Sequence, residues 1–488
     1  MESIKPFLRR FPPYLWLANR YRTLRRLVAY PETARVGDVN YDDYWDAKAQ
    51  EGLGKLSRFR RTRAEALASV IRPGSKVLDL GVGDGAILKY LVDTLGIEAY
   101  GLDISPKAVE YCRSIGLNVD LADINEPIGA AIADHYDYII MSEIIEHIPD
   151  PEALLNRLRD RATALIVSVP NTGYYQHRLR LLLGRFPLQW VVTPGEHLRF
   201  WTVVDFRWWI SAGGRPSSGF VSRTRSHTRG SRSCGVCGRT CSDRGWSTCW
   251  RMGRGRQVMA ETPKYHKAAI FDPATAHPDD AHSILMRLIP RGSRVLELGC
   301  ASGYLSGYME NALSCHVTGL EADPAAVSIA STRCSEVHQV DLDAPDALEA
   351  ARTSGPYDVL LAAAVLEHLK NPETVLEAAR DLLKPEARAI VSLPNIANWR
   401  FRVKLLFGQF DYTDYGVMDR THCRLYTVRT GQALLEETGY VVEALHVAGS
   451  GPQNILNGLA RRWRKPEPRP FLPGLFAYEL IYVARKAN

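Results

Sequence analysis

The stretch VLDLGVGDG, residues 77–85, decides the fold of the first half of the chain. Its first four residues read as a short buried strand, and Gly81, Gly83 and Gly85 follow at alternate positions before a helical pattern that starts at Ile87. A Cβ in such a turn would keep the backbone from approaching a nucleotide-like ligand, and open α/β sheets bind ligands just beyond their strand ends. The stretch recurs at residues 295–303 as VLELGCASG, so the sequence predicts two copies of a strand, a tight turn and a helix.

Three acidic residues recur at equivalent points of each copy. The first stands two residues before the first glycine, the second ends the next predicted strand, and the third follows the strand after that. They are Asp79, Asp103 and Asp123 in the first copy and Glu297, Glu321 and Asp341 in the second. The second acid of each copy is suitably placed to bind both hydroxyls of a ribose.

This succession, followed by YDYIIMSEIIEH in one copy and YDVLLAAAVLEH in the other, resembles the class I S-adenosylmethionine-dependent methyltransferases. Within them it is similar to the MetW-like and the ubiquinone-biosynthesis O-methyltransferase-like members. The resemblance implies two Rossmann-like α/β domains, each with a mostly parallel seven-stranded sheet and helices on both faces. It also implies that S-adenosylmethionine is bound by Asp79, Gly81, Gly83, Gly85, Asp103 and Asp123 in the first domain and by Glu297, Gly299, Ala301, Gly303, Glu321 and Asp341 in the second. A nicotinamide enzyme is the rival for the first turn, because Gly81, Gly83 and Ala86 satisfy the loose dinucleotide pattern.

The spacing of equivalent residues predicts a duplication. Glu297 follows Asp79 by 218 residues, Glu367 follows Glu146 by 221, and His422 follows His197 by 225. Such a small drift indicates two complete units. We therefore expect a basic aromatic arm and helix over residues 1–56, a methyltransferase domain over 57–214, an unstructured segment over 215–258, and a second methyltransferase domain over 259–488.

The segment 215–258 interrupts this repeat. From Arg215 to Arg256 there is no Leu, Ile, Ala, Glu or Lys, while Arg, Ser, Gly, Cys and Trp abound. An out-of-frame translation, with the frame restored just before Met259, explains this composition and predicts that the first domain lacks its last strands. A zinc knot and an arginine-rich linker for nucleic acid remain the alternatives. The zinc knot would be built from Cys234, Cys237, Cys241 and Cys249.

The overall composition favours a globular protein that stays in the cytoplasm. No apolar run reaches the 18 residues of a membrane span, and the first residues lack the apolar core of a signal peptide. The net charge of +7 predicts a mild attraction to anionic surfaces, but nucleic acid is not an expected partner. Residues 1–30 alternate basic and aromatic side chains, a pattern that suits a peripheral membrane contact, a protein partner or a solvated arm.

Carboxylates and imidazoles follow the fourth strand of each copy. Glu143, Glu146 and His147 form E-x-x-E-H, and His197 follows in the segment that usually builds the substrate lid. Such a set suits a hard divalent cation such as Mg²⁺ and resembles the metal quartet of small-RNA 2′-O-methyltransferases. The alternative is that these residues cap a helix and hold the lid. In the second copy Glu367, His368 and His422 are kept, but Ala364 replaces the first glutamate, so the metal site is expected in the first domain.

We expect the chain to O-methylate a small hydroxylated acceptor such as a sugar, a glycan end or a quinol-like ring. His197 and His422 are the first candidates for a general base, and His147 and His368 are the competitors. The alternative function is a MetW-like subunit that binds the cofactor, or nothing, and works through a partner enzyme.

Overall fold

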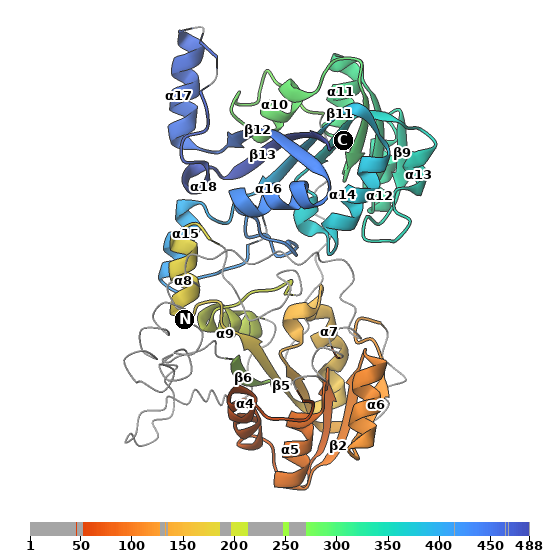
Figure 1. Cartoon of the computed structure of the whole chain (residues 1–488), viewed down its shortest axis with the longest axis vertical. Helices are drawn as coiled ribbons and strands as arrows, with labels where there is room; N and C mark the ends of the chain where they lie inside the picture. Colours follow the sequence, from red (N-terminus) through yellow and green to blue (C-terminus); the bar gives the residue numbers. More distant parts are fainter. Residues whose placement is uncertain are drawn as a thin grey trace, which may run out of the picture.

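The computed structural model describes residues 45, 52–126, 132, 135–185, 197–212, 247–252 and 270–487, except 414, 464 and 467. They form two α/β units, one above the other in Figure 1. The expectations for the arm at residues 1–30, for Cys234, Cys237 and Cys241, and for Met259 lie outside the described residues. No described helix has both the length and the apolar character needed to cross a membrane.

The first unit is built on a sheet with the order β3-β2-β1-β4-β5-β6. Strands β1 to β5 are parallel, and β6 is antiparallel to β5. Its elements are α4 (Arg58–Ala68), β1 (Lys76–Leu80), α5 (Ala86–Leu95), β2 (Glu98–Asp103), α6 (Pro106–Ser114), β3 (Asn118–Leu121), β4 (Tyr136–Ser142), η1 (Ile145–His147), α7 (Pro151–Leu158), η2 (Arg159–Arg161), β5 (Ala162–Pro170), α8 (Tyr175–Leu182), α9 (Val203–Ala212) and β6 (Ser247–Met252).

The second unit repeats this plan with seven strands in the order β12-β13-β11-β10-β7-β8-β9. The antiparallel strands β12 and β13 close one edge. Its elements are α10 (Ala281–Leu288), β7 (Arg294–Leu298), α11 (Ser306–Leu313), β8 (His316–Glu321), α12 (Pro324–Ala330), β9 (Glu336–Gln339), α13 (Glu349–Arg352), β10 (Tyr357–Ala363), η3 (Leu366–His368), α14 (Pro372–Asp381), β11 (Leu383–Pro394), α15 (Trp399–Leu406), α16 (Val428–Glu437), β12 (Tyr440–Ala448), α17 (Gly451–Arg462), α18 (Pro473–Phe476) and β13 (Glu479–Lys486).

Burial on both faces explains why the strands are short apolar runs. In β1, Leu78 and Leu80 pack in a cluster on one face of the first sheet, and Val77 packs in a second cluster on the other face. The connecting helices begin at capping residues. The Ser105 side chain accepts a hydrogen bond from the Ala108 amide at the start of α6, and Asp150 does the same for α7. The Rossmann-like fold predicted from the sequence is therefore confirmed for both units.

Strand β6 lies inside the segment predicted to be unstructured. It pairs with β5 from Pro170–Ser247 to Leu165–Met252, and β13 pairs with β11 in the same register, from Pro394–Glu479 onward. Residues 247–252 thus correct the prediction for their part of the segment, because an open strand edge pairs through backbone groups whatever the side chains are. The described residues contain no counterpart of β12 in the first sheet, which has one strand fewer than the second.

The second unit has a contact between the segment before its first helix, α10, and the late helix α17. Asp279, just before α10, has a fully buried side chain that accepts hydrogen bonds from Asn457 and Arg461 of α17. The distance from Arg461 Nη2 to Asp279 Oδ2 is 2.7 Å. This pair joins the two segments.

Candidate functional site

The glycine-rich turns have the backbone geometry that the sequence predicts. Gly81, Gly83 and Gly85 all have positive φ values, of 70°, 60° and 67°. In the second unit Gly299 and Gly303 also have positive φ values, and Ala301 adopts a φ of 46° although it carries a Cβ. Left-handed backbone favours glycine, so the conformation of the turns accounts for the glycines at these positions.

The acid that ends the second strand holds the turn in both units. Asp103 Oδ2 accepts a hydrogen bond of 2.8 Å from the Gly83 amide, and Glu321 Oε2 accepts one of 2.9 Å from the Ala301 amide. The structure therefore brings the first turn and the second strand together as expected. The third acids lie in the loops after β3 and β9, where Asp123 and Asp341 each accept a hydrogen bond from the amide two residues later.

The acid that precedes the turn is buried in both units. Burial, and next the charge of Asp103, raise the pKa of Asp79 to about 8. Burial also raises the pKa of Glu297 to about 8, against a hydrogen bond from Ser306. Among the described residues, the Asp79 Oδ1 atom has no hydrogen-bond partner.

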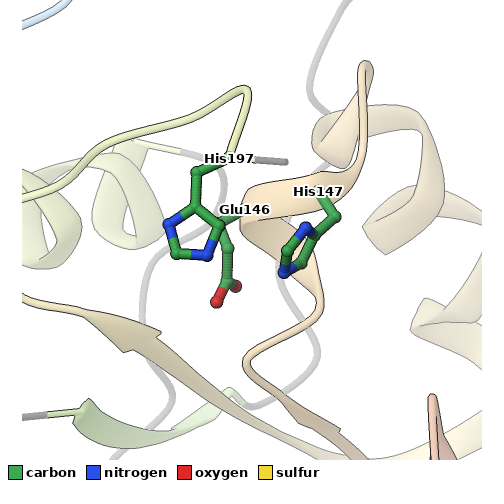
Figure 2. A group of neighbouring side chains, drawn as sticks. All are labelled: Glu146, His147 and His197. Atoms are coloured by element: carbon green, nitrogen blue, oxygen red, sulfur yellow. The ribbon is translucent and has the colours of Figure 1, made fainter. Parts of the chain in front are cut away.

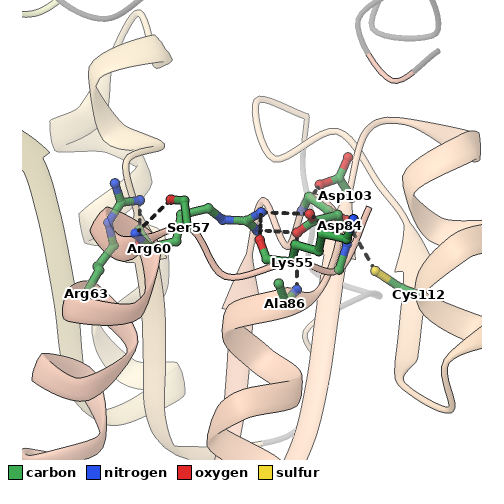
Figure 3. A network of polar contacts seen from close by, with 11 residues as sticks. Lys55, Ser57, Arg60, Arg63, Asp84, Ala86, Asp103 and Cys112 are labelled. Carbon is green, nitrogen blue, oxygen red and sulfur yellow. Dashed lines mark hydrogen bonds and ion pairs between the residues drawn. The ribbon is translucent and has the colours of Figure 1, made fainter. Parts of the chain in front are cut away.

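Three residues near the first turn carry contacts that the sequence does not reveal. The Arg60 guanidinium pairs with Asp84, whose carboxylate also accepts a hydrogen bond of 3.1 Å from the Gly54 amide (Figure 3). The Trp45 ring lies over Gly83, because a Cβ built there would be 3.1 Å from Trp45 Cη2. The sequence hints at the ion pair only through Asp84, the acid inside the turn. Any nearby basic residue could pair with this acid, so the sequence does not identify Arg60 as its partner.

Each unit gathers one glutamate and two histidines at the end of its fourth strand. In the first they are Glu146, His147 and His197, which lie together in Figure 2, and in the second Glu367, His368 and His422. One ligand atom from each residue lies within 4.8 Å of the others. The two imidazole rings of each trio meet edge to face, with centroids 4.7 Å apart.

Burial disfavours the charged forms of the two glutamates and of His197 and His422. It raises the pKa of Glu146 and Glu367 well above the usual range. It lowers the pKa of His197 to about 3 and that of His422 to about 4. Neither carboxylate oxygen of Glu146 has a hydrogen-bond partner within the described part of the chain. An unpaired buried carboxylate is costly, so the trio is a candidate for holding a cation.

Glu143 is not part of the trio, although, besides burial, its charge is close enough to raise the pKa of Glu146. Its carboxylate pairs with Arg63 at 2.6 Å, and its backbone has a left-handed φ of 57°. The candidate cation site of the first unit is therefore a trio and not the expected quartet. Ala364 has nearly the same φ, 52°, at the equivalent place in the second unit. The trio itself is present in both units, although the sequence predicts a metal site in the first domain only.

Comparison with known proteins finds a matching family model for each unit. Residues 61–212 match the model described as methionine biosynthesis protein MetW, and residues 275–445 match a model described as a methyltransferase domain. A bifunctional methionine biosynthesis protein MetXA/MetW of Rhodopirellula baltica is 28% identical over 223 residues, which cover 39% of this chain and 35% of that protein. A ubiquinone biosynthesis O-methyltransferase of Paraburkholderia xenovorans is 38% identical over 109 residues, 22% of this chain and 44% of that protein.

The chain thus spans less than half the length of these two relatives. Among solved structures, a TehB-like SAM-dependent methyltransferase from Corynebacterium glutamicum is 17% identical with a TM-score of 0.28, and the match covers 42% of this chain and 86% of that one.

Proposed function

Because the chain carries two domains of the class I S-adenosylmethionine-dependent methyltransferase family, we propose that it methylates a hydroxyl group of a small acceptor. The observation that carries the proposal is the repeated contact between a strand-end acid and the middle amide of the turn, Asp103 with Gly83 and Glu321 with Ala301. A sugar, a glycan end or a quinol-like ring is the proposed acceptor class.

The residues around each turn fit S-adenosylmethionine. Asp103 and Glu321 would bind the ribose hydroxyls, and Asp123 and Asp341 would lie near the adenine. The Asp79 Oδ1 atom, buried and unpartnered within the described residues, would accept a hydrogen bond from the ammonium group of the methionine part. A cationic ligand suits this place because Asp79 and Asp103 repel each other when both are ionised.

The protein's part in the reaction is to align the acceptor and to keep water out, since the sulfonium group already activates its methyl group. His197 and His422 are the predicted general bases. With pKa values of about 3 and 4 they are weak bases at neutral pH. Deprotonation of the acceptor by these imidazoles alone is therefore inefficient, and a second contribution is needed.

We propose instead that the imidazoles and the glutamate of each trio hold a divalent cation, which takes the place of an imidazole base in both domains. Two neutral imidazoles and one carboxylate suit Zn²⁺, Mn²⁺ or Fe²⁺ better than Mg²⁺, which prefers oxygen ligands. The donor set therefore does not support the Mg²⁺ expected from the sequence. A bound cation would lower the pKa of an acceptor hydroxyl, and Glu146 and Glu367 would ionise on binding it.

A transfer assay with the full chain tests the proposal. The chain is incubated with isotope-labelled S-adenosylmethionine and a panel of quinols and sugars, with Zn²⁺ or Mn²⁺ present, and labelled products are measured by mass spectrometry. The control is the double variant Asp103→Ala/Glu321→Ala, which should bind the cofactor more weakly and show reduced transfer. Cofactor binding by calorimetry without transfer to any acceptor would contradict the proposal and favour a MetW-like subunit that works through a partner enzyme.

A further inference from the structure

The two domains touch through equivalent helices that make the same contact in both directions. Helix α8 (Tyr175–Leu182) corresponds to α15 (Trp399–Leu406), and the two lie side by side between the domains in Figure 1. Arg178 Nη1 donates a hydrogen bond of 3.1 Å to the Leu406 carbonyl. In return Arg402 Nη1 donates one of 3.0 Å to the Leu182 carbonyl.

Each arginine is held in position by its own domain before it reaches across. Arg178 Nε donates to the Gly173 carbonyl, and Arg402 Nε donates to the Ala397 carbonyl at the equivalent place. A glycine of the other domain leaves room for each guanidinium. A Cβ on Gly184 would lie 2.7 Å from Arg402 Nη2, and a Cβ on Gly408 would lie 2.8 Å from Arg178 Nη2.

The two arginine contacts stabilise the C-terminal ends of both helices. The last carbonyls of a helix have no partner inside it, and here the final carbonyl of each helix is capped by an arginine of the other. Between the helices, Leu181 and Leu405 are fully buried in one cluster with Phe200. Each domain thus contributes the same set of residue types to the contact: one arginine, two leucines and one glycine.

Such reciprocity defines an isologous interface, the kind formed by two copies of one surface about a two-fold axis. We propose that α15 is a self-complementary docking surface whose partner is a second copy of the second domain, seated as α8 is seated in the full chain. Replacing the first domain by a second copy keeps every member of the reciprocal contact. Arg402 would take the place of Arg178, Leu405 that of Leu181 and Gly408 that of Gly184.

The second domain can be tested by itself because its sheet and its two largest apolar clusters lie within it, although a third cluster also includes Leu181 and Phe200 of the first domain. All seven strands of its sheet lie within residues 294–486, and both of its main apolar clusters are made only of residues 271–484. The segment before α10 is joined to α17 by Asp279 and Arg461. Residues 270–488 therefore form a complete folding unit.

Sedimentation velocity of residues 270–488 over a concentration series tests the proposal. Covalent linkage in the full chain gives two surfaces an effective concentration of about 1 mM, so the isolated domain has to be studied up to roughly that value. We expect the average mass to rise from monomer to dimer with concentration. A monomer at every concentration would overturn the proposal.

Substitution of Arg402 gives a signature that an unrelated association would lack. In a symmetric dimer the variant Arg402→Ala removes the contact twice, so if one loss weakens binding about tenfold, the dimer should weaken about 100-fold. When the variant and the unchanged domain are mixed, the dimer that contains one of each loses the contact once. This mixed dimer should be weakened only about tenfold. Arg400→Ala is the matched control, because Arg400 is on the same helix, is exposed and stacks on its neighbour Trp399.

Arg402 also holds Ala397 and Gly474 within its own domain, so a second variant separates docking from folding. The Tyr412 hydroxyl accepts a hydrogen bond of 3.1 Å from the Phe200 amide of the other domain. Leu425 would take the place of Phe200 in a dimer of second domains. Tyr412→Phe should weaken the dimer and leave the thermal midpoint of the domain unchanged. A dimer that neither variant weakens would use another surface and would overturn the proposal.

Discussion

The two domains share the contacts of their turns and their buried trios, and they differ just after the fourth strand of each sheet. Both have the acid-to-turn contact and the buried trio of one glutamate and two histidines. After the fourth strand, the first domain has an ion pair between Glu143 and Arg63, whereas the second has Ala364 and, 218 residues after Arg63, Ala281. The contacts of the turn and the trio thus recur in both domains, whereas the ion pair after the fourth strand is found in the first.

The largest expected effect concerns the trio. Glu146→Ala and Glu367→Ala should each lower metal-dependent transfer by their own domain on the order of 100-fold or more, because a ligand of the proposed cation is lost. Each is measured with the other domain silenced by Glu321→Ala or Asp103→Ala. A chelator should have the same effect, reversed by Zn²⁺ or Mn²⁺. If chelation affects only the first domain, the two trios do not have the same role, and the trio of the second domain is structural.

The acid-to-turn contact is expected to have the next largest effect. Glu321→Ala should weaken S-adenosylmethionine binding by the second domain by roughly 1.5 to 3 kcal/mol, because charge-assisted hydrogen bonds are lost. Asp103→Ala should do the same in the first domain, and calorimetry on the two single variants measures the loss of each site. Unchanged affinity in either variant would remove the ribose assignment for that domain.

The pH dependence of binding should be equal in the two domains. Asp79 and Glu297 each have a pKa of about 8 without ligand, so both are mainly protonated at pH 7. A cationic ligand favours the ionised carboxylate, so binding should release protons below pH 8. Affinity should then rise by up to about tenfold per pH unit towards pH 8 and level off above it. Calorimetry in two buffers of different ionisation enthalpy counts the protons, and Asp79→Asn is the control that should release none in the first domain.

The smallest effect concerns the left-handed residue after the fourth strand. Ala364→Gly should stabilise the second domain by roughly 0.5 to 1 kcal/mol, because glycine adopts a φ of 52° without strain. Glu143→Gly relieves the same strain but also breaks the ion pair with Arg63, so it should not stabilise the first domain. Thermal unfolding of the two variants compares them. An equal gain in both would mean that the ion pair adds nothing to stability.

Sequence patterns predict the elements well where burial is two-sided. The strand expected at residues 77–80 lies within β1, and Asp103 and Glu321, expected to end the second strands, are the last residues of β2 and β8. The positions of the strand-end acids could also be predicted, because the carboxyl ends of parallel strands meet at one edge of the sheet.

Contacts between distant segments could not be predicted in this way. The direction of Glu143 depends on one left-handed φ and on an arginine from a helix before the first strand. The antiparallel pairing of β6 depends on the open edge of β5, which no pattern within residues 247–252 records. The reciprocal contact of Arg178 and Arg402 needs both domains in place before either residue has its partner.

The contact between Asp279 and Arg461 sets a time scale for the synthesis of the protein. The two residues are 182 positions apart, so a ribosome that adds 5–20 residues per second needs about 10–40 s to make the second after the first. During this interval the carboxylate has no cationic partner from α17 and stays in water, since burying it unpaired is costly. The segment before α10 therefore joins its domain only after α17 has been made.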